Sequence, residues 1–283
     1  MIDLHLHTTA SDGRLAPAAL VARAAGLGLT TISVTDHDTT AALAEAADAA
    51  ARHGLRLVPG IEITAVERAR DVHVLGYFFD PDHAPFVEFL RAQRDDRRRR
   101  VETMIARLAE LGMPLDGEAL LGRVRPGSGR AIGRPHVADA LVTAGFAVDR
   151  GDAFDRFIAE GQPAFVPRHG ASVGEVAAIV RAAGGVASLA HPALMRQDQA
   201  IAGFAADGLS ALEVWHSDHD AAAIERYDAM ARQLGLGRSG GSDFHADHSH
   251  HASGFGRVTL PLQAFADLEA RAAQSARSRR SIP

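Results

Sequence analysis

Short apolar runs in this chain end, again and again, in a histidine or an acidic residue. Ile2-Asp3-Leu4 leads into His5 and His7, and Val186-Ala187-Ser188-Leu189 leads into His191. The pattern recurs at Asp36-His37, Glu62, His73, His216 and Asp243-Phe244-His245. Side chains so far apart in the sequence share one site only if the fold gathers the ends of the strands. A parallel α/β barrel does so, because its sites form at the C-terminal ends of its strands. The pattern therefore predicts a metalloenzyme built on such a barrel.

The composition restricts the metals that this site could hold. The chain has 283 residues and no cysteine, which excludes disulfides, thiolate nucleophiles and zinc–thiolate sites. Imidazole and carboxylate ligands suit Mn, Fe, Zn or Mg. The sequence also lacks lysine, so arginine supplies all 30 basic residues. Schiff-base catalysis is therefore excluded, and any phosphate would be bound by arginine, histidine, backbone N–H groups or metal.

Charge and hydropathy limit the partners of the chain. Its formal net charge of −5 argues against a broad polyanion-binding surface, although local arginine clusters would still bind phosphate. No window approaches about 18 uninterrupted apolar residues, and the N-terminus lacks a basic segment followed by an apolar one. We expect a cytoplasmic protein with no membrane segment, and the sequence points to no obligate protein partner.

Predicted strands and helices alternate along the chain, apart from one long helical stretch. Strands are expected at 55–63, 72–79, 164–166, 186–190 and 211–215, and helices at 17–26, 39–53, 86–111, 172–183 and 220–234. From 84 to 162 the pattern is helical throughout. We predict a discontinuous barrel of residues 1–83 and 163–271, interrupted by a helical cap of residues 84–162. The polar, Arg-rich segment 272–283 is expected to be a disordered tail.

The order of the ligand-type motifs resembles that of a known family. The motifs are His5-x-His7, Asp12, Thr35-Asp36-His37, Gly60-Ile61-Glu62, His73, Ala190-His191-Pro192 and Ser242-Asp243-Phe244-His245. Together they resemble the PHP (polymerase and histidinol phosphatase) family, in particular its small bacterial phosphoesterases of the nucleoside 3′,5′-bisphosphate phosphatase type. The resemblance implies an α/β fold, a distorted (β/α)₇ barrel with a helical cap insertion, that holds two to three divalent metal ions.

The resemblance also implies three sets of metal ligands. The first set is His5, His7, Glu62 and Asp243; the second is Glu62, His73 and His191; the third is Asp12, His37 and His245. Glu62 would bridge two metals, because an anionic bridge offsets their mutual repulsion. Mn²⁺ is favoured, with Fe²⁺, Zn²⁺ and Mg²⁺ as alternatives. Asp36 or Asp38 either orients a ligand or caps its loop. The histidine-rich segment at His248, His250 and His251 is expected to be a solvated loop.

Candidate substrate contacts lie in the insertion and just after two strands. Arg134 and His136 stand where a helix begins in Gly133-Arg134-Pro135-His136, which suits an anion, and Arg168 could reach the same phosphate. His136 or His216 could protonate the leaving alkoxide, and His216 is also a candidate contact to the phosphate. The Arg97–Arg100 run, in contrast, lies among acidic residues and indicates a solvated helix face with i,i+4 ion pairs.

The expected reaction is hydrolysis of a phosphomonoester by a hydroxide that bridges two metals. The substrate would be a small nucleotide, either a nucleoside 3′,5′-bisphosphate or an AMP-like compound, with short RNA 5′ ends as a further candidate. Gln162 replaces a lysine frequent in this branch, and the His216/His219 pair is not required by it. Both differences fall where a substrate would sit, so the resemblance defines the reaction class better than the substrate. Three alternatives stay open: a histidinol-phosphate phosphatase, a mononuclear amidohydrolase and a non-catalytic metal-binding module.

Overall fold

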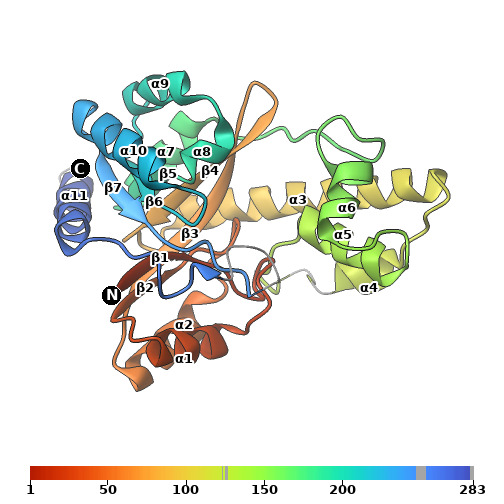
Figure 1. The fold of residues 1–283 in the computed structure, drawn as a ribbon, viewed down its shortest axis with the longest axis horizontal. Helices are drawn as coiled ribbons and strands as arrows, with labels where there is room; N and C mark the ends of the chain where they lie inside the picture. The colour runs from red at the N-terminus through yellow and green to blue at the C-terminus, as the bar shows by residue number, and fades with distance from the viewer. Residues whose placement is uncertain (123, 125–126, 247–252, 281–283) are drawn as a thin grey trace.

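A computed structural model describes residues 1–122, 124, 127–246 and 253–280. Within these residues, seven strands form one curled sheet whose order follows the sequence. The strands are β1 (Ile2–Leu6), β2 (Thr31–Val34), β3 (Arg56–Glu67), β4 (Arg70–Tyr77), β5 (Val186–Leu189), β6 (Ala211–Trp215) and β7 (Gly237–Gly240). An isolated bridge between Leu6 and Phe244 joins the two edges of the sheet. The α/β architecture agrees with the expected distorted barrel (Figure 1).

The direction of β4 corrects the expectation of an all-parallel barrel. β1, β2 and β3 are parallel, and so are β5, β6 and β7, but β4 runs antiparallel to both of its neighbours. The reason is the short connection after β3. Arg68 and Ala69 both have positive φ, 49° and 64°, as in a two-residue hairpin turn. A connection of this length reverses the chain, whereas a parallel neighbour would need a long crossover.

Helices cover the sheet on its outer side. They are α1 (Pro17–Gly26), α2 (Leu43–His53), α7 (Val173–Ala182), α8 (Pro192–Met195), α9 (Ile201–Ala206), α10 (Ala221–Gln233) and α11 (Leu262–Arg280), with a 3-10 turn η2 (Asp198–Ala200). The helix predicted at 17–26 is confirmed, and α2 begins four residues later than predicted. None of the described helices is long and apolar enough to cross a membrane.

Two of the expected local structures are wrong. Of the expected disordered tail 272–283, residues 272–280 continue α11, which packs Ala272 beside Leu268 in the core, and 281–283 lie outside the described residues. The predicted strand at 164–166 does not form. The carbonyls of Phe165 and Val166 accept hydrogen bonds from Arg107 and Arg100 instead of from a neighbouring strand.

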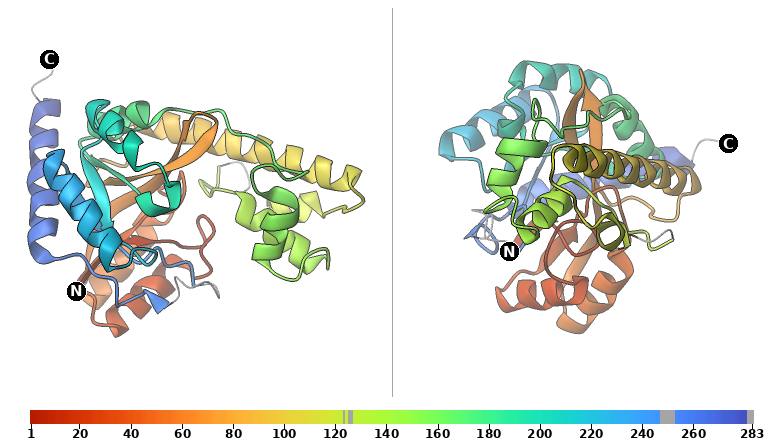
Figure 2. Two further views of the ribbon diagram at one scale, coloured as in Figure 1. Left: turned by 45° about the horizontal axis from the view of Figure 1, so that its top comes forward. Right: turned by 90° about the vertical axis from the view of Figure 1, so that its right-hand side faces the viewer.

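The segment between β4 and β5 holds a group of helices that extends to one side of the sheet along α3 (Figures 1 and 2). These helices are α3 (Ala84–Glu110), α4 (Gly117–Gly122), α5 (Arg134–Thr143) and α6 (Arg150–Ala153), followed by the π-helical turn η1 (Phe154–Ile158). They bury an apolar cluster of their own around Met104, Leu108, Val137 and Leu141. This separate core supports our proposal that 84–162 is a cap inserted into a barrel of 1–83 and 163–271.

Gly241 controls how closely the chain after β7 approaches β1. A Cβ atom at this position would lie 2.3 Å from the backbone nitrogen of His5 and 2.7 Å from Asp3 Oδ1. Both contacts are far below normal van der Waals separations, and neither backbone can move without disturbing the site. Glycine is therefore required here by space and not by φ.

We predict that Gly241→Ala lowers the free energy of unfolding by about 1–3 kcal/mol, the usual cost of overpacking a well-packed region. Gly26→Ala is the matched control, because nothing lies within 4 Å of its added Cβ and alanine favours the helix. Chemical denaturation of both variants measures the difference. Equal stability of the two would contradict the close approach.

Candidate metal centre

The structure gathers the predicted ligand side chains beside the C-terminal ends of the parallel strands. All nine lie in one cluster: His5, His7, Asp12, His37, Glu62, His73, His191, Asp243 and His245. Three groups drawn from these nine have donor atoms within 4.8 Å of one another: His5, His7, Glu62 and Asp243; His7, Asp12, His37 and His245; and His37, Glu62 and His73. A fourth group of this kind joins His5 to two residues outside the set, Glu213 and His216. The third group contains His37 where the sequence suggested His191.

Glu62 lies at the centre of this cluster. Its Oε2 is 3.4 Å from His5 Nε2, and 3.2 Å from both His7 Nε2 and His37 Nδ1. Its Oε1 is 2.7 Å from His73 Nδ1 and 3.1 Å from His191 Nε2. One buried carboxylate thus has five imidazole nitrogens around its two oxygens. That arrangement suits a carboxylate shared between metal ions.

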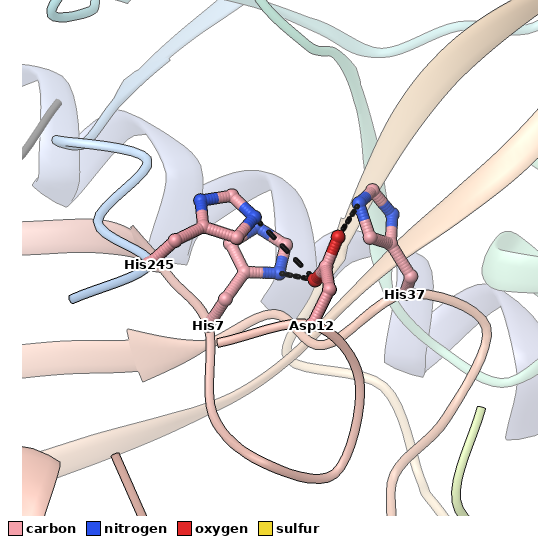
Figure 3. Close-up of side chains that lie close together, drawn as sticks. All are labelled: His7, Asp12, His37 and His245. Atoms are coloured by element: carbon pink, nitrogen blue, oxygen red, sulfur yellow. Dashed lines mark ion pairs between the residues drawn. The ribbon is translucent and has the colours of Figure 1, made fainter. Parts of the chain in front are cut away.

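Asp12 organises the neighbouring group, as Figure 3 shows. Its Oδ1 lies 3.7 Å from His7 Nδ1 and 3.4 Å from His245 Nε2, and its Oδ2 lies 3.5 Å from His37 Nε2. The rings of His7 and His245 stack with centroids 4.0 Å apart. This carboxylate reaches the cluster because the loop after β1 folds back tightly, with the N–H of Gly13 donating to the Thr8 carbonyl at 3.0 Å.

Unsatisfied buried atoms indicate that the cluster fits metal ions. Among the described residues, His5 Nε2, His7 Nε2 and Glu62 Oε2 are buried and make no hydrogen bond, although they face one another. Buried polar atoms in folded proteins almost always have a partner. Imidazole nitrogens and a carboxylate oxygen that converge on a shared space are also the donors that Mn, Fe and Zn accept.

The electrostatics of the cluster favour charged carboxylates and at least one neutral imidazole. Burial by itself raises the pKa of Glu62, but His37, His73 and His5 outweigh it and hold the pKa well below its usual range. Burial lowers the pKa of His37 to about 3, because the nearby positive groups add to desolvation and offset Glu62 and Asp12. An anionic carboxylate and a neutral imidazole are the forms that bind metal.

Glu213 is a residue that the sequence reasoning missed. It is fully buried in β6, and its Oε1 accepts a hydrogen bond from His5 Nδ1 at 3.0 Å. Its Oε2 accepts from the backbone N–H of His191 at 2.7 Å. A carboxylate only accepts, so the His5 proton is on Nδ1 and Nε2 is left for a metal. His191 has a φ of 26°, unusual for a residue other than glycine, and this hydrogen bond helps to hold it there.

His216 lies behind the cluster and not on its open side. The residue is 2% exposed, and its Nε2 is 3.5 Å from Asp243 Oδ2. Its Nδ1 accepts a hydrogen bond from the Asp218 N–H at 3.1 Å. This geometry suits a side chain that orients Asp243 better than one that reaches a leaving group.

Three further buried carboxylates fix the loops around the cluster. Asp36 accepts hydrogen bonds from the Thr8 N–H and the Ser11 hydroxyl, which ties down the loop that carries Asp12. Asp3 accepts from the N–H groups of His5 and Ser242, and burial raises its pKa to about 6. The third, Asp38, binds the cap. Asp36 therefore orients the Asp12 loop, and no hydrogen bond or ion pair between Asp36 and the His37 ring is found in the described residues.

The arginine run of α3 is partly buried, which corrects the expectation of a solvated face. Arg97 binds the carboxylate of Asp38 and donates to Thr64 Oγ1 at 2.7 Å. Arg100 binds Asp71 at 3.3 Å and the Val166 carbonyl at 2.7 Å. Of the other two arginines of the run, Arg98 makes the expected i,i+4 pair, with Glu102, and Arg99 makes an i,i+3 pair with Asp96. Arg97 thereby joins the cap to the residue that follows His37.

The remaining substrate candidates occupy the boundary between cap and barrel. Arg134 is half-buried, with Nη2 at 3.1 Å from Asp71 Oδ2 and its guanidinium over the Phe154 ring. Arg168 is buried and donates to Asp38 at 3.1 Å. His136 Nδ1 accepts from the Gly133 N–H at 3.2 Å, and burial lowers its pKa. His248, His250 and His251 lie outside the described residues.

Comparisons with known proteins agree with this site. Residues 3–96 match the family model described as the PHP domain. The 5′-3′ exoribonuclease Rnm of Escherichia coli is 37% identical over 250 residues, which cover 86% of this chain and 84% of the relative. A 3′,5′-nucleoside bisphosphate phosphatase of Chromobacterium violaceum is 34% identical over 252 residues, which cover 87% of each. A crystal structure from Bifidobacterium adolescentis, described as a candidate metal-dependent phosphoesterase, matches with a TM-score of 0.87 at 36% identity, over 95% of this chain and 96% of that one.

We predict that Glu213→Gln lowers the number of bound metal ions by at least one per chain while the fold is retained. Both partners of Glu213 are N–H donors, and a glutamine amide offers only one acceptor oxygen to the two of them. Elemental analysis after dialysis gives the metal content, and circular dichroism checks the fold. Glu225→Gln, on the exposed side of α10, is the control. A full metal complement in Glu213→Gln would contradict the role of Glu213 in orienting the metal ligands.

Proposed function

Because this chain belongs to the PHP family of metal-dependent phosphoesterases, we propose that it hydrolyses phosphate esters of nucleotides at the Glu62 cluster. The observation that carries the proposal is the position of Glu62, whose two oxygens lie within 3.4 Å of five imidazole nitrogens. A shared carboxylate of this kind is the arrangement expected for two or more divalent cations in one phosphoesterase site.

We assign the ligands to three metal positions. The first is held by His5, His7, Glu62 and Asp243; the second by Glu62, His73 and His191; the third by Asp12, His37 and His245. The short distances around Glu62 and Asp12 support these sets. His37 lies near both carboxylates, so it could serve the second position as well as the third. Mn²⁺ is the metal that we favour, because the set contains only imidazole and carboxylate donors.

In the proposed mechanism, the cations and the side chains have different roles. When bound, divalent cations supply Lewis-acid chemistry that acidifies water and neutralises phosphate charge. The side chains of this chain orient the donors and bind the substrate. Glu213 holds His5 and the backbone of His191, and His216 faces Asp243. We therefore assign His216 to orientation of Asp243 and leave His136 as the candidate proton donor.

Arginine provides the proposed contacts to the phosphate groups. Arg134 stands at the boundary of cap and barrel, and its guanidinium is held by Asp71 and by Phe154. Its guanidinium is suited to an anion, because this planar group binds phosphate in a bidentate manner. Arg168 is as buried as His216 and is paired with Asp38 and Asp96, so we assign it to positioning Asp38 and not to the substrate.

The names of the relatives support a nucleotide as substrate. One relative is named for a nucleoside 3′,5′-bisphosphate and the other for RNA degraded from its 5′ end. Both substrates carry a 5′-nucleotide with a phosphate at its 3′ position. We propose that this unit is what the present chain recognises. A phosphate-release panel that includes histidinol phosphate and AMP separates this substrate from the other small phosphate esters.

We predict that exhaustive chelation abolishes phosphate release from a nucleoside 3′,5′-bisphosphate and that added Mn²⁺ restores it. The reason is that the negative charge of the carboxylate ligands in the cluster is balanced by the bound cations. Colorimetric phosphate assay and elemental analysis on the same samples give activity and metal content together. Full activity in protein without detectable metal would exclude the proposed chemistry.

We further predict that Glu62→Gln binds at least one metal ion fewer and loses about a hundredfold or more in kcat, the scale typical of losing a principal electrostatic group in an active site. A neutral amide cannot offset repulsion between cations. The exposed Glu118→Gln on α4 controls for the loss of a carboxylate elsewhere. Unchanged metal content and turnover in Glu62→Gln would show that the site has been assigned to the wrong residues.

A further inference from the structure

A short segment of the cap, residues 129–132, lies against the barrel loops that carry two of the metal ligands. We call this segment the strap. It precedes α5, and its Ala131 and Ile132 are each 2% exposed. Ile132 packs in the apolar core of the cap, so the strap belongs to the cap by its packing. Its hydrogen bonds, however, are made to the barrel.

The strap bonds directly to the loop after β1, which carries Asp12. The N–H of Ala131 donates to the Ala10 carbonyl at 2.9 Å, and Arg130 Nη2 donates to Thr9 Oγ1 at 3.3 Å. Ala10 is itself buried, in the apolar core beneath α1 and α2. The strap and this loop therefore meet through their backbones at buried positions, so a shift of the loop is passed to the strap.

The strap also bonds to the loop after β2, which carries His37. The hydroxyl of Thr39, a residue that is 2% exposed, donates to the Gly129 carbonyl. Gly129 has a φ of 69°, and a Cβ atom at this position would lie 3.2 Å from the Cβ of Ala41. Glycine therefore allows the strap to lie close against this second loop.

The ligands assigned to the third metal position are all connected to the cap. In Figure 3, Asp12 lies between the ring of His37 and that of His245. The strap contacts the loops of Asp12 and His37. The carbonyl of His245 accepts a hydrogen bond from the Arg14 N–H at 2.8 Å, and the Arg14 side chain reaches Asp139 of α5 at 3.3 Å. Movement of the cap would therefore disturb every ligand of this position.

The other two metal positions depend more on the sheet. His5, Glu62 and His73 stand within β1, β3 and β4, whose backbones are held by the neighbouring strands. Asp12, in contrast, lies in a turn outside the strands. The cap does reach β4, but Arg134 and Arg100 bind the side chain of Asp71 there and not the strand backbone. The third position is thus the one whose geometry is most dependent on the cap.

The position of the strap also determines whether a cavity forms beside the metal centre. This cavity has a volume of about 430 Å³. Asp12 and Arg14 line it from the barrel, and Arg130, Ala131 and His136 line it from the cap. If the strap left the loop after β1, the wall made by Arg130 and Ala131 would be lost. His136, the candidate proton donor, faces a closed cavity only while the strap is docked.

We propose that docking of the strap is coupled to occupancy of the third metal position. When Asp12 holds a cation, the loop after β1 is fixed, and this loop in turn holds the strap and closes the cap. The proposal rests on the proposed function, from which it takes the assignment of the metal positions. Such coupling is reciprocal, so the docked strap strengthens cation binding by the same factor. The cavity is therefore complete only when the metal centre is complete.

The first test measures amide hydrogen exchange of the full-length protein with and without Mn²⁺. We expect Mn²⁺ to slow exchange at the Ala131 N–H at least about fivefold, the lower end of typical coupling between sites, and to have no such effect in Asp12→Asn. The N–H of Leu260, which bonds to the Ile2 carbonyl, corrects for overall stabilisation by metal. Equal protection of Ala131 in wild-type protein and in Asp12→Asn would overturn the proposal.

The second test is a double-mutant cycle read by Mn²⁺ titration calorimetry. Thr39→Val removes the hydroxyl that binds Gly129 and should weaken one Mn²⁺ position at least about fivefold, but should change nothing further when Asp12→Asn is present. Thr103→Val is the matched control, because it removes a hydroxyl that donates to a carbonyl on the exposed side of α3. Arg130→Gln, at an exposed position, should act in the same direction as Thr39→Val and tests the link if the latter lowers the melting temperature.

The results separate the coupling from the metal assignment. An equal effect of Thr39→Val with and without Asp12→Asn would overturn the coupling, because it would show that the two residues act independently. Normal Mn²⁺ binding in both Thr39→Val and Arg130→Gln would overturn it as well. Wild-type protein that binds no Mn²⁺ would instead overturn the proposed function itself, so the two failures are distinguishable.

Discussion

The arrangement of the whole site depends on one buried carboxylate surrounded by imidazoles. Glu62 is 1% exposed and has five histidine nitrogens within 3.4 Å. Asp12 and Asp243 lie in the same cluster, and both carboxyl pKa values are held well below their usual range, because neighbouring histidines outweigh the effect of burial. So much buried negative charge must be balanced by positive charge. When no metal is bound, protonated histidines must provide this positive charge. Burial by itself lowers the pKa of His7, but the carboxylates of Asp243 and Glu62, each 3.2 Å from its Nε2, raise it to about 10. Metal ions bound here would replace these protons, which would couple metal binding to proton release.

Backbone strain is concentrated where the ligands leave the strands. Asp38, His191 and Asp243 all have positive φ although none is glycine. Such conformations cost on the order of 1–3 kcal/mol each and persist only where the surrounding structure enforces them. The surroundings do so here through hydrogen bonds, since the Glu213 carboxylate binds the N–H of His191, the His5 carbonyl binds the N–H of Asp243, and Arg97 and Arg168 bind the Asp38 side chain. These hydrogen bonds therefore hold the chain in conformations that the strand geometry alone would not give.

The cap is connected to the metal cluster by ion pairs in addition to apolar packing. Arg97 of α3 reaches Asp38, next to His37, while Arg100 and Arg134 share Asp71, two residues before His73. Arg14 of the barrel reaches Asp139 of α5. Every cation in these pairs is arginine, because the chain contains no lysine. Arginine keeps its charge when buried and can bind two acceptors at once, so the same side chains can fix the cap and still face a phosphate group.

The sequence by itself determined the types and order of the ligands, because histidines and acids that follow apolar runs are visible without any contact information. It also determined that no cysteine thiolate can hold a metal and that arginine is the only strong cation. Only the tertiary structure decided which strands run antiparallel, since a two-residue turn at Arg68 and Ala69 reverses β4.

The role of Glu213 likewise could not be read from the sequence, because it stands in an apolar strand and its partner His5 lies 208 positions away. Arg97 was misassigned for the same reason: its helix shows charges on all sides, and only the packing of α3 against the barrel decides which arginine is buried beside Asp38. Local sequence patterns indicate which interactions a residue can make, but long-range packing determines which partner it contacts.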